Sequence, residues 1–318
     1  MTAAVLAQLP RVPVGDWFQA VVNWLEDNVG PFFDFVDLVV RSAVQGLTTA
    51  LNWPPPLVLV VVLALLALWL RSWKFALFTL IGMGLVVSMQ EFPSAMQTLA
   101  LVLVASIVAI AISVPLGVLS ARRPRVWQAV RPVLDLMQTM PPFVYLIPVI
   151  FFFNIGAVPG VVATVIFALP PGVRMTQLGI RQVDHEVVEA GEAFGAPPSR
   201  ILRGIQLPLA MPSIMAGINQ VIMLALSMVV IAGMVGAQGL GTEVYTAVTR
   251  VQLGAGFEAG LSVVILAVYL DRMTAVLSDR SPVSRAARAA NPARRRRVGP
   301  QQDKSQPDTS QPVGSQQE

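Results

Sequence analysis

Six stretches of this chain contain no charged residue, and they constrain its fold more than any other feature. They cover residues 42–70, 75–90, 92–121, 136–173, 204–242 and 259–270. A charge at the middle of a lipid bilayer costs about 2.5–3.5 kcal/mol on insertion scales, so these stretches favour lipid as the solvent. Only 13% of the 318 residues are charged and 55% are hydrophobic, which excludes a water-soluble enzyme or a disordered regulator as the main body.

The charge-free stretches predict seven membrane-spanning helices, and therefore an all-α, polytopic helix bundle. One helix needs roughly 20 residues to cross a bilayer, and the longer stretches exceed that length. The expected spans lie near residues 54–70, 74–90, 95–120, 133–153, 157–174, 211–236 and 256–272. The stretch 136–173 has room for two crossings, with a turn supplied by Asn154, Gly156, Pro159 and Gly160.

Positive residues collect in alternate loops of this seven-span arrangement. Cytoplasmic loops retain arginine and lysine, so the bias predicts a cytoplasmic C-terminus and an external N-terminus. The loops assigned to the cytoplasm carry Arg71, Lys74, Arg122, Arg123, Arg125, Arg131, Arg174, Arg181, Arg200 and Arg203. The loops on the other side carry Glu91, Glu243, Arg250 and Glu258. The span count and the charge bias therefore agree.

The two ends of the chain differ from the central part. Residues 14–50 mix apolar and aromatic positions with acids, which predicts one or two amphipathic helices on the outer membrane surface; a soluble N-terminal arm is the alternative. We expect an outer amphipathic arm over residues 1–53, a transmembrane domain over 54–278 and a disordered basic cytoplasmic tail over 279–318.

The tail contains a run of four arginines. Such a run favours contact with anionic lipid, at about 1 kcal/mol per arginine near the surface, while a simple topology anchor is the alternative. The four residues are Arg294, Arg295, Arg296 and Arg297.

Enzyme signatures are missing from the sequence. The chain has no cysteine and a single histidine, His185, which excludes thiol chemistry and a histidine cluster for a metal. It also lacks a GxxxxGK[ST] phosphate loop, an HExxH motif and a GxSxG motif. We therefore predict no catalytic residue and no metal site, and we expect His185 to be a solvated loop residue.

One cytoplasmic loop predicts two short helices joined by a tight turn. Val187–Phe194 contains helix formers, Gly195 permits a left-handed conformation, and the pair Pro197–Pro198 favours a new helix start. Pro208 and Pro212 are expected to end the second helix and to mark the start of the next span. Such a helix-turn-helix can dock into a groove on another protein. An ordinary connecting loop is the alternative that composition favours.

The spacing within this loop, residues 186–209, resembles the EAA loop of bacterial ABC-importer permeases. That pattern is Glu-Ala-Ala, three residues, Gly, nine residues, Ile, one residue and Leu-Pro, and six of its seven fixed positions match. The matching segment carries Glu189, Ala190, Gly191, Gly195, Ile205, Leu207 and Pro208. The departure is Gly191, where the pattern has alanine. A glycine costs up to about 1 kcal/mol of helix propensity, so it is expected to loosen the first helix.

The resemblance narrows to one subfamily. Residues 131–174 and 205–241, within a similarity that runs from about 54 to 277, look like the permease subunit of glycine betaine/proline importers. This resemblance implies a type I ABC-importer permease in a bacterial cytoplasmic membrane. It further implies a homodimer bound to two cytoplasmic ATPase subunits and an external substrate-binding protein, with the EAA loop as the link to the ATPase. ATP and Mg are then expected on the partner ATPase, with no cofactor on this chain.

Three functions remain open on the sequence. The first is import of glycine betaine, proline or a related quaternary-amine solute. The second is import of another solute by the same architecture, such as choline, carnitine, ectoine or an amino acid. The third is an ATP-independent carrier or channel, which predicts a membrane-embedded acid or an inverted repeat. Asp135 is the only acid expected near a span interior, and it lies close to a basic inner end.

Polar residues on otherwise apolar spans are candidates for the translocation path, since a polar group facing lipid is costly. Hydrogen bonding between helices is an equally good explanation for them. The candidates are Gln138, Thr139, Tyr145, Asn219, Gln220 and Ser227.

Overall fold

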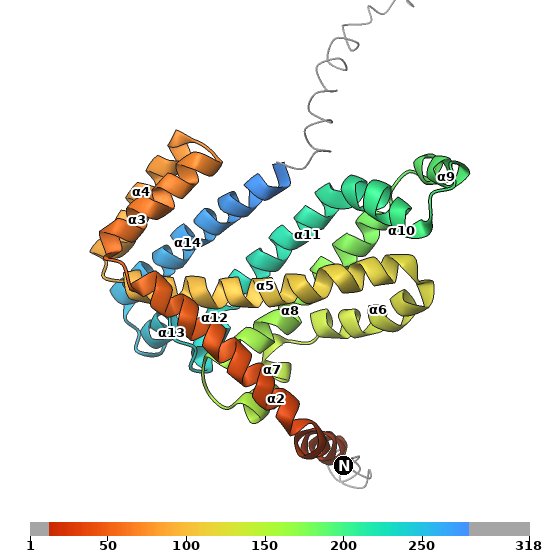
Figure 1. Ribbon diagram of the computed structural model, residues 1–318. Helices are drawn as coiled ribbons and strands as arrows, with labels where there is room; N and C mark the ends of the chain where they lie inside the picture. The colour runs from red at the N-terminus through yellow and green to blue at the C-terminus, as the bar shows by residue number, and fades with distance from the viewer. Residues whose placement is uncertain (1–12, 280–318) are drawn as a thin grey trace, which may run out of the picture.

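The computed structural model describes residues 13–279, and every regular element within that range is helical (Figure 1). In chain order the elements are α2 Val14–Asn52, α3 Pro56–Leu70, α4 Trp73–Ser88, α5 Phe92–Arg122, α6 Pro124–Thr139, α7 Pro142–Phe153, α8 Ala157–Arg181, α9 His185–Ala193, α10 Pro198–Ile201, a π-helical turn Leu202–Gln206, α11 Leu207–Ser227, α12 Val229–Met234, α13 Leu240–Thr249 and α14 Leu253–Asp279. The predicted all-α fold is confirmed.

Helices α5, α8 and α11 form the centre of the bundle. Ala109, Ala168 and Val221, one from each helix, are fully buried in a common cluster. Small residues let the backbones approach closely: a Cβ on Gly172 of α8 would lie 2.5 Å from the Oγ of Ser113 on α5. Close packing of small residues is the usual way for apolar helices to associate in lipid.

Helices α3, α4 and α14 pack on one side of this centre. Val60, Met83 and Leu266, one from each of these helices, belong to one buried cluster. At the end of the α3 helix, the guanidinium of Arg71 donates a hydrogen bond of 3.2 Å to the carbonyl of Arg272 on α14. The turn after α3 therefore lies beside the later part of α14.

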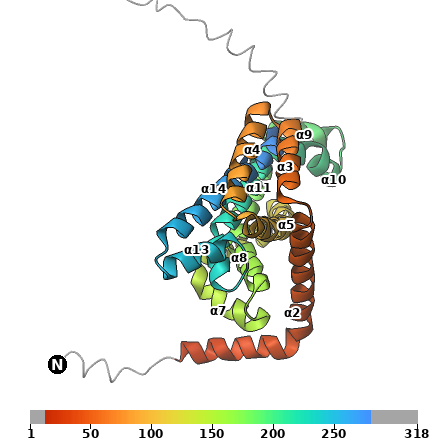
Figure 2. The same ribbon diagram turned by 90° about the vertical axis from the view of Figure 1, so that its left-hand side faces the viewer.

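Helix α2 has a projecting first part and a packed second part. It contains Pro31, and Figure 2 shows that it bends and that its first part extends away from the bundle. Beyond the bend, Val44 is buried against α5, and the ring of Phe33 stacks on Phe152 of α7 at 4.2 Å. The first part exposes a set of large apolar side chains: Trp17, Phe18, Val21 and Trp24. The structure has one bent helix where the sequence predicted one or two, and a position on the outer membrane surface stays a prediction.

Four helical segments are long and apolar enough to cross a membrane, or up to six if each of two bent helix pairs counts as one span. The four are Phe92–Arg122, Ala157–Arg181, Pro198–Met234 and Leu253–Ala275. Helix α4 is apolar but has only 16 residues, and α3 has 15. Both are shorter than the roughly 20 residues that one crossing needs, so helix length supports fewer spans than the seven predicted.

The predicted span 133–153 is wrong as a single helix. Its residues divide between α6 and α7, which are bent by 101°. The residue before a proline is disfavoured in helical geometry, and Met140, which precedes the pair Pro141–Pro142, adopts an extended ψ of 133°. Apolar composition placed this segment in lipid but did not reveal the break.

The acidic residues predicted for one side of the membrane do come together. Glu91, in the turn before α5, has a pKa raised above its ordinary value by burial and then by the nearby charges of Glu243 and Glu258. Helix α13, the start of α5 and the N-terminal end of α8 lie at the end of the bundle opposite α9 (Figure 1). The expected disordered tail, including Arg294 to Arg297, lies outside the described residues.

Candidate coupling loop and translocation path

Helix α9 is capped at both ends by residues that are local in sequence. The carboxylate of Asp184 accepts a hydrogen bond of 3.0 Å from the backbone N–H of Glu186 at the first turn. At the other end Gly195 adopts φ +74°, and Ala196 donates to the carbonyl of Gly191 at 3.1 Å. This glycine-capped ending is a common one for helices, and it places the turn where the sequence predicted it.

The second half of the loop packs back on α9 through Gly191. A Cβ on Gly191 would lie 2.8 Å from the Cδ1 of Ile205 and 3.5 Å from the Cγ1 of Ile201. The glycine that departs from the EAA pattern therefore leaves room for a close approach of the second helical segment. The clash of an alanine here would involve mainly the flexible end of Ile205, so the two halves of the loop stay in contact with either residue.

Helix α9 projects from the bundle with no buried residue (Figure 1). Glu189 and Ala190 lie on it and are exposed. Phe194, directly after it, is 93% exposed. His185 is also exposed, as predicted, although it starts the helix instead of lying in a loop; its Nδ1 lies 3.0 Å from the Glu189 carboxylate. An apolar ring and a carboxylate on a projecting helix form a surface suited to a protein partner.

Pro208 and Pro212 do not end the second helix, contrary to the prediction. Residues 198–234 form one helical run, interrupted at Leu202–Gln206 by a π-helical turn in which Leu207 donates to the carbonyl of Leu202, five residues back. A π turn widens the backbone locally, which accommodates the ring that Pro208 places against the preceding turn. The loop is therefore continuous with α11.

The junction between loop and bundle is buried. Leu202 and Ala210 lie in one cluster with Ile180, near the end of α8, and Leu207 packs against it. Ile205 and Pro208 are half-buried beside this cluster. The seven residues of the EAA pattern thus divide into an exposed part on α9 and a packed part at the start of α11.

Of the six candidate path residues, Tyr145 and Asn219 lie at packed positions within the bundle. Tyr145 is buried on α7 together with Met228, the residue between α11 and α12, and Met140 at the α6–α7 break packs on the same cluster. Two interruptions of helix geometry therefore meet at Tyr145. Non-helical backbone at membrane depth is tolerated where protein buries it or where it lines a cavity.

The other four candidates point away from the centre of a single copy. Gln138 and Gln220 are exposed. Thr139 donates to the carbonyl of Leu136 at 3.2 Å, and Ser227 donates to that of Met223 at 3.0 Å, so both hydroxyls are satisfied within their own helices. These side chains do not converge on Tyr145.

Asn219 instead contacts α14, through a residue that the sequence reasoning missed. Its amide nitrogen donates to the carboxylate of Asp271 at 3.3 Å, and its oxygen accepts from the hydroxyl of Thr274 at 2.8 Å. Asp271 lies within the predicted span 256–272, although the sequence analysis named only Asp135 as an acid near a span interior, and α14 continues past it to Asp279. Asp135, the acid that the sequence singled out, is paired with Arg174 of α8.

A projecting loop joined to a central apolar helix, on a bundle that is helical throughout residues 13–279, fits the ABC-importer permeases that the EAA spacing resembles. A family model described as the binding-protein-dependent transport system inner membrane component matches residues 113–281, more than half of the chain, and the chain belongs to that family. It is therefore a membrane-embedded subunit of a transport system.

Individual relatives match over most of the chain. It is 52% identical to the glycine betaine transport system permease protein OpuAB of Bacillus subtilis (strain 168), over 84% of this chain and 95% of the relative. It is 45% identical to the glycine betaine/carnitine transport permease protein GbuB of Listeria monocytogenes, over 87% and 99%. Among solved structures, inward-facing MetNI methionine ABC transporter resembles it with a TM-score of 0.51 and 25% identity, over 61% of this chain and 94% of that chain. The fold is that of a type I importer.

Proposed function

We propose that this chain is the membrane-spanning subunit of an ATP-driven importer that carries glycine betaine, proline or a related quaternary-amine solute into the cell. The observation that carries the substrate class is the 52% identity, over 95% of its length, with a Bacillus subtilis permease named for glycine betaine transport. A relative from Escherichia coli strain K12, 44% identical, is named for glycine betaine and proline betaine.

The proposed partner on the cytoplasmic side is a separate ATPase that holds ATP and Mg, with no cofactor on this chain. Its contact surface is α9 and the following turn, where Glu189 and Phe194 are exposed. Because the helical run from Pro198 continues through the π turn into α11 and is anchored by Leu202, a displacement of the loop is passed on to α11. This is the kind of element through which a ligand bound elsewhere biases a two-state bundle.

In the proposed arrangement the N-terminus is external, the C-terminus is cytoplasmic, and the membrane is the bacterial cytoplasmic membrane. The amphipathic arm 1–53 lies on the outer leaflet, the permease domain is 54–278, and the basic tail is 279–318. A substrate-binding protein docks at the end of the bundle that carries Glu91. The orientation is supported by the positive-inside bias of the loops.

A second copy of the chain completes the proposed translocation path. Gln220 and Ser227 are seven residues apart on α11 and both are exposed on a single copy. Exposed polar side chains at membrane depth are costly in lipid, so a path between two copies gives them a suitable environment. Gln138 and Thr139 belong to the same proposal, with Tyr145 and Asn219 as the packed residues behind them.

Two other functions compete with this one. Relatives named for carnitine and for trimethylamine N-oxide leave room for another small solute. An ATP-independent carrier is favoured by one observation, which is that Asp271 lies within α14 and bonds to Asn219 of α11. A membrane-embedded acid of this kind is typical of carriers.

Uptake of labelled betaine into vesicles tests the proposal. The vesicles hold this chain with its proposed partner ATPase and substrate-binding protein, with and without ATP. Uptake that needs ATP and all three proteins supports the importer, whereas uptake by this chain alone supports the carrier. If the complex assembles and takes up carnitine or choline with ATP, but not betaine, then the proposed solute is wrong and the proposed importer architecture is supported.

A surface variant tests the docking surface within the same assay. Phe194→Asp places a charge at an exposed position of the loop, so folding is expected to be unaffected. The expected result is loss of ATPase binding and of ATP-dependent uptake. The matched control is Thr249→Asp, exposed on α13 at the opposite end of the bundle, which leaves ATPase binding unchanged.

A further inference from the structure

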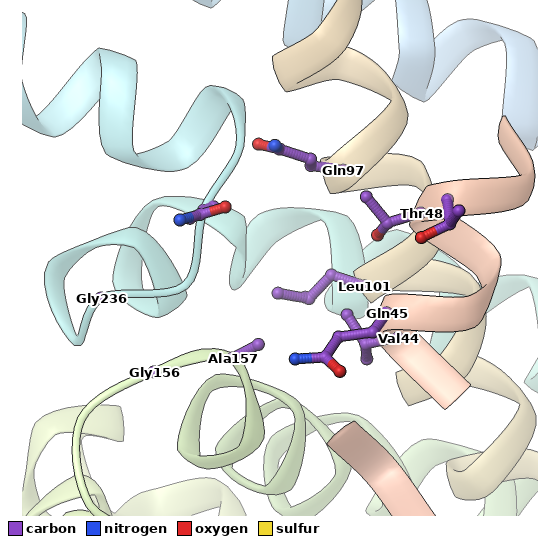
Figure 3. A pocket seen from close by; sticks show the side chains of 10 residues that line it. Val44, Gln45, Thr48, Gln97, Leu101, Gly156, Ala157 and Gly236 are labelled. Atoms are coloured by element: carbon purple, nitrogen blue, oxygen red, sulfur yellow. The ribbon is translucent and has the colours of Figure 1, made fainter. Parts of the chain in front are cut away.

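A cavity of about 320 Å³ opens at the end of the bundle opposite the coupling loop; its wall is largely apolar but carries several polar side chains, and it is called the polar cavity below. It lies between the second part of α2, the first part of α5, the start of α8 and the loop that joins α12 to α13 (Figure 3). Gln45, Gln97 and Gln238 contribute an amide each from three of these elements, and Thr48 contributes a hydroxyl. In Figure 3 the side chain of Gln45 reaches from α2 toward Ala157.

The walls of this cavity are held by backbone contacts between segments distant in sequence. Leu240 donates from its backbone to the hydroxyl of Thr98 at 2.8 Å, in a buried hydrogen bond. Gly156 donates to the carbonyl of Val235 at 2.9 Å. A Cβ on Gly239, where φ is +133°, would lie 2.5 Å from the Thr98 hydroxyl. The loop is thus fixed against α5 and α8, and it keeps the cavity open.

The lining carries no charged side chain. The guanidinium of Arg41, which lines an adjoining cavity of about 100 Å³, is held by Asp37 in two hydrogen bonds of 2.9 and 3.0 Å. A ligand with net charge therefore meets no free counter-ion here and loses solvation without compensation. A net-neutral zwitterion suits amide groups, because an amide N–H donates to a carboxylate and the amide oxygen, the negative end of the dipole, faces a cation favourably.

The volume of the cavity also favours a small ligand. Pockets for small molecules run from about 300 to 1,000 Å³, so this cavity is at the lower limit and suits a compact solute. The side chains lie partly in solvent: Gln97 is half-buried, and Gln45 and Gln238 are exposed. Partial exposure gives weak binding, as a site needs if the solute must leave it again.

We propose that this cavity is an external acceptor site for a small, net-neutral zwitterion on its way into the translocation path. The amide N–H groups of Gln97 and Gln238 donate to the carboxylate of the zwitterion, and the amide oxygens face its cationic end. This inference rests on the proposed function, since it takes the solute class and the external position of this end from it. The site receives the solute after the binding protein releases it.

The natural absence of cysteine allows a direct test. Ala157→Cys, at a half-buried lining position that contributes no polar side chain, is prepared in the full complex in vesicles. It is labelled from outside with a membrane-impermeant thiol reagent, with betaine as the probe. A bound solute slows labelling by the factor 1 + [L]/Kd, so betaine at ten times Kd gives about tenfold protection. Thr249→Cys, exposed on α13 outside the cavity, is the matched control and should show no protection.

Three outcomes overturn the inference. One is equal labelling of Ala157→Cys with and without betaine in a complex that still transports betaine, which refutes the site and keeps the proposed function. Another is protection of the cysteine from labelling by ligand-free binding protein alone, which would mean that the binding protein covers the cavity and that no solute site has been detected. The third is equal protection by choline, which has the quaternary ammonium without the carboxylate and so carries net charge.

A second measurement covers the case in which the cysteine variant fails to assemble. Gln238→Leu changes an exposed loop side chain, so assembly is expected to be retained. The site predicts a raised KM for betaine with kcat and the ATP requirement unchanged. An unchanged KM, with transport intact, contradicts the site.

Discussion

Replacement of Gly195 by valine isolates the effect of one backbone torsion in the coupling loop. Gly195 has φ +74°, and a Cβ at this position would meet nothing within 4 Å. The substitution therefore adds no clash with another residue and acts only through backbone strain. A left-handed conformation costs an L-residue about 1–2 kcal/mol, and the cost is greatest for β-branched side chains.

This strain is expected to appear as weaker ATPase binding. If the docked loop needs the conformation described above, then about 1–2 kcal/mol corresponds to a roughly 5- to 30-fold higher Kd for the partner ATPase. The measurement is a titration of the ATPase against this chain in lipid nanodiscs. Thermal unfolding should change little, because α9 has no buried residue.

Asparagine provides the matched control at the same position. It tolerates the left-handed region better than other non-glycine residues, so Gly195→Asn should bind the ATPase nearly as well as the natural chain. Equal Kd values for the valine and asparagine variants would refute the reasoning, since both add a side chain and only the valine adds the full strain.

Three further predictions concern the bundle, each checked by thermal unfolding in detergent. Gly241→Ala should destabilise the fold by about 1–3 kcal/mol, because its Cβ would collide with the first carbonyl of α12, which cannot rotate away. Glu91→Gln should raise the unfolding temperature at pH 7 and lose that advantage as the pH falls toward 4. The pKa of Glu91 is raised, so the folded state favours the protonated form and loses stability as pH rises. Asp271→Leu should cost about 0.6 kcal/mol, and a double-mutant cycle with Asn219→Leu should show non-additivity if their hydrogen bond contributes.

Three proline pairs show how far the sequence could predict the fold. Pro197–Pro198 begins a helix, Pro141–Pro142 separates two, and Pro170–Pro171 lies within the continuous helix α8. The same dipeptide has different outcomes because packing differs. Leu169 and Gly172 beside the third pair are buried between neighbouring helices, whereas Pro141 is exposed. Tertiary contacts decide whether a helix survives its prolines, and they are not visible in local sequence.

The candidate site likewise contains some residues that the sequence could predict and others that depend on tertiary contacts. The loop positions from Glu189 to Pro208 follow a local spacing, so the sequence located them and also the turn at Gly195. The contact of Asn219 with Asp271 joins residues 52 positions apart on different helices, and the polar cavity draws its side chains from several separate elements. No periodicity or motif signals such meetings, because they depend on how the helices cross.

The position of the π turn affects how a displacement of α9 by the proposed ATPase is transmitted to the bundle. The segment that transmits a displacement of α9 must be rigid where it contacts the bundle, yet a π turn is a weak point in a helix. Here the turn lies between α10 and α11, and the burial of Leu202 and Ala210 against Ile180 clamps it from both sides. Under the proposed function, a displacement of α9 therefore carries the start of α11 with it instead of bending the turn.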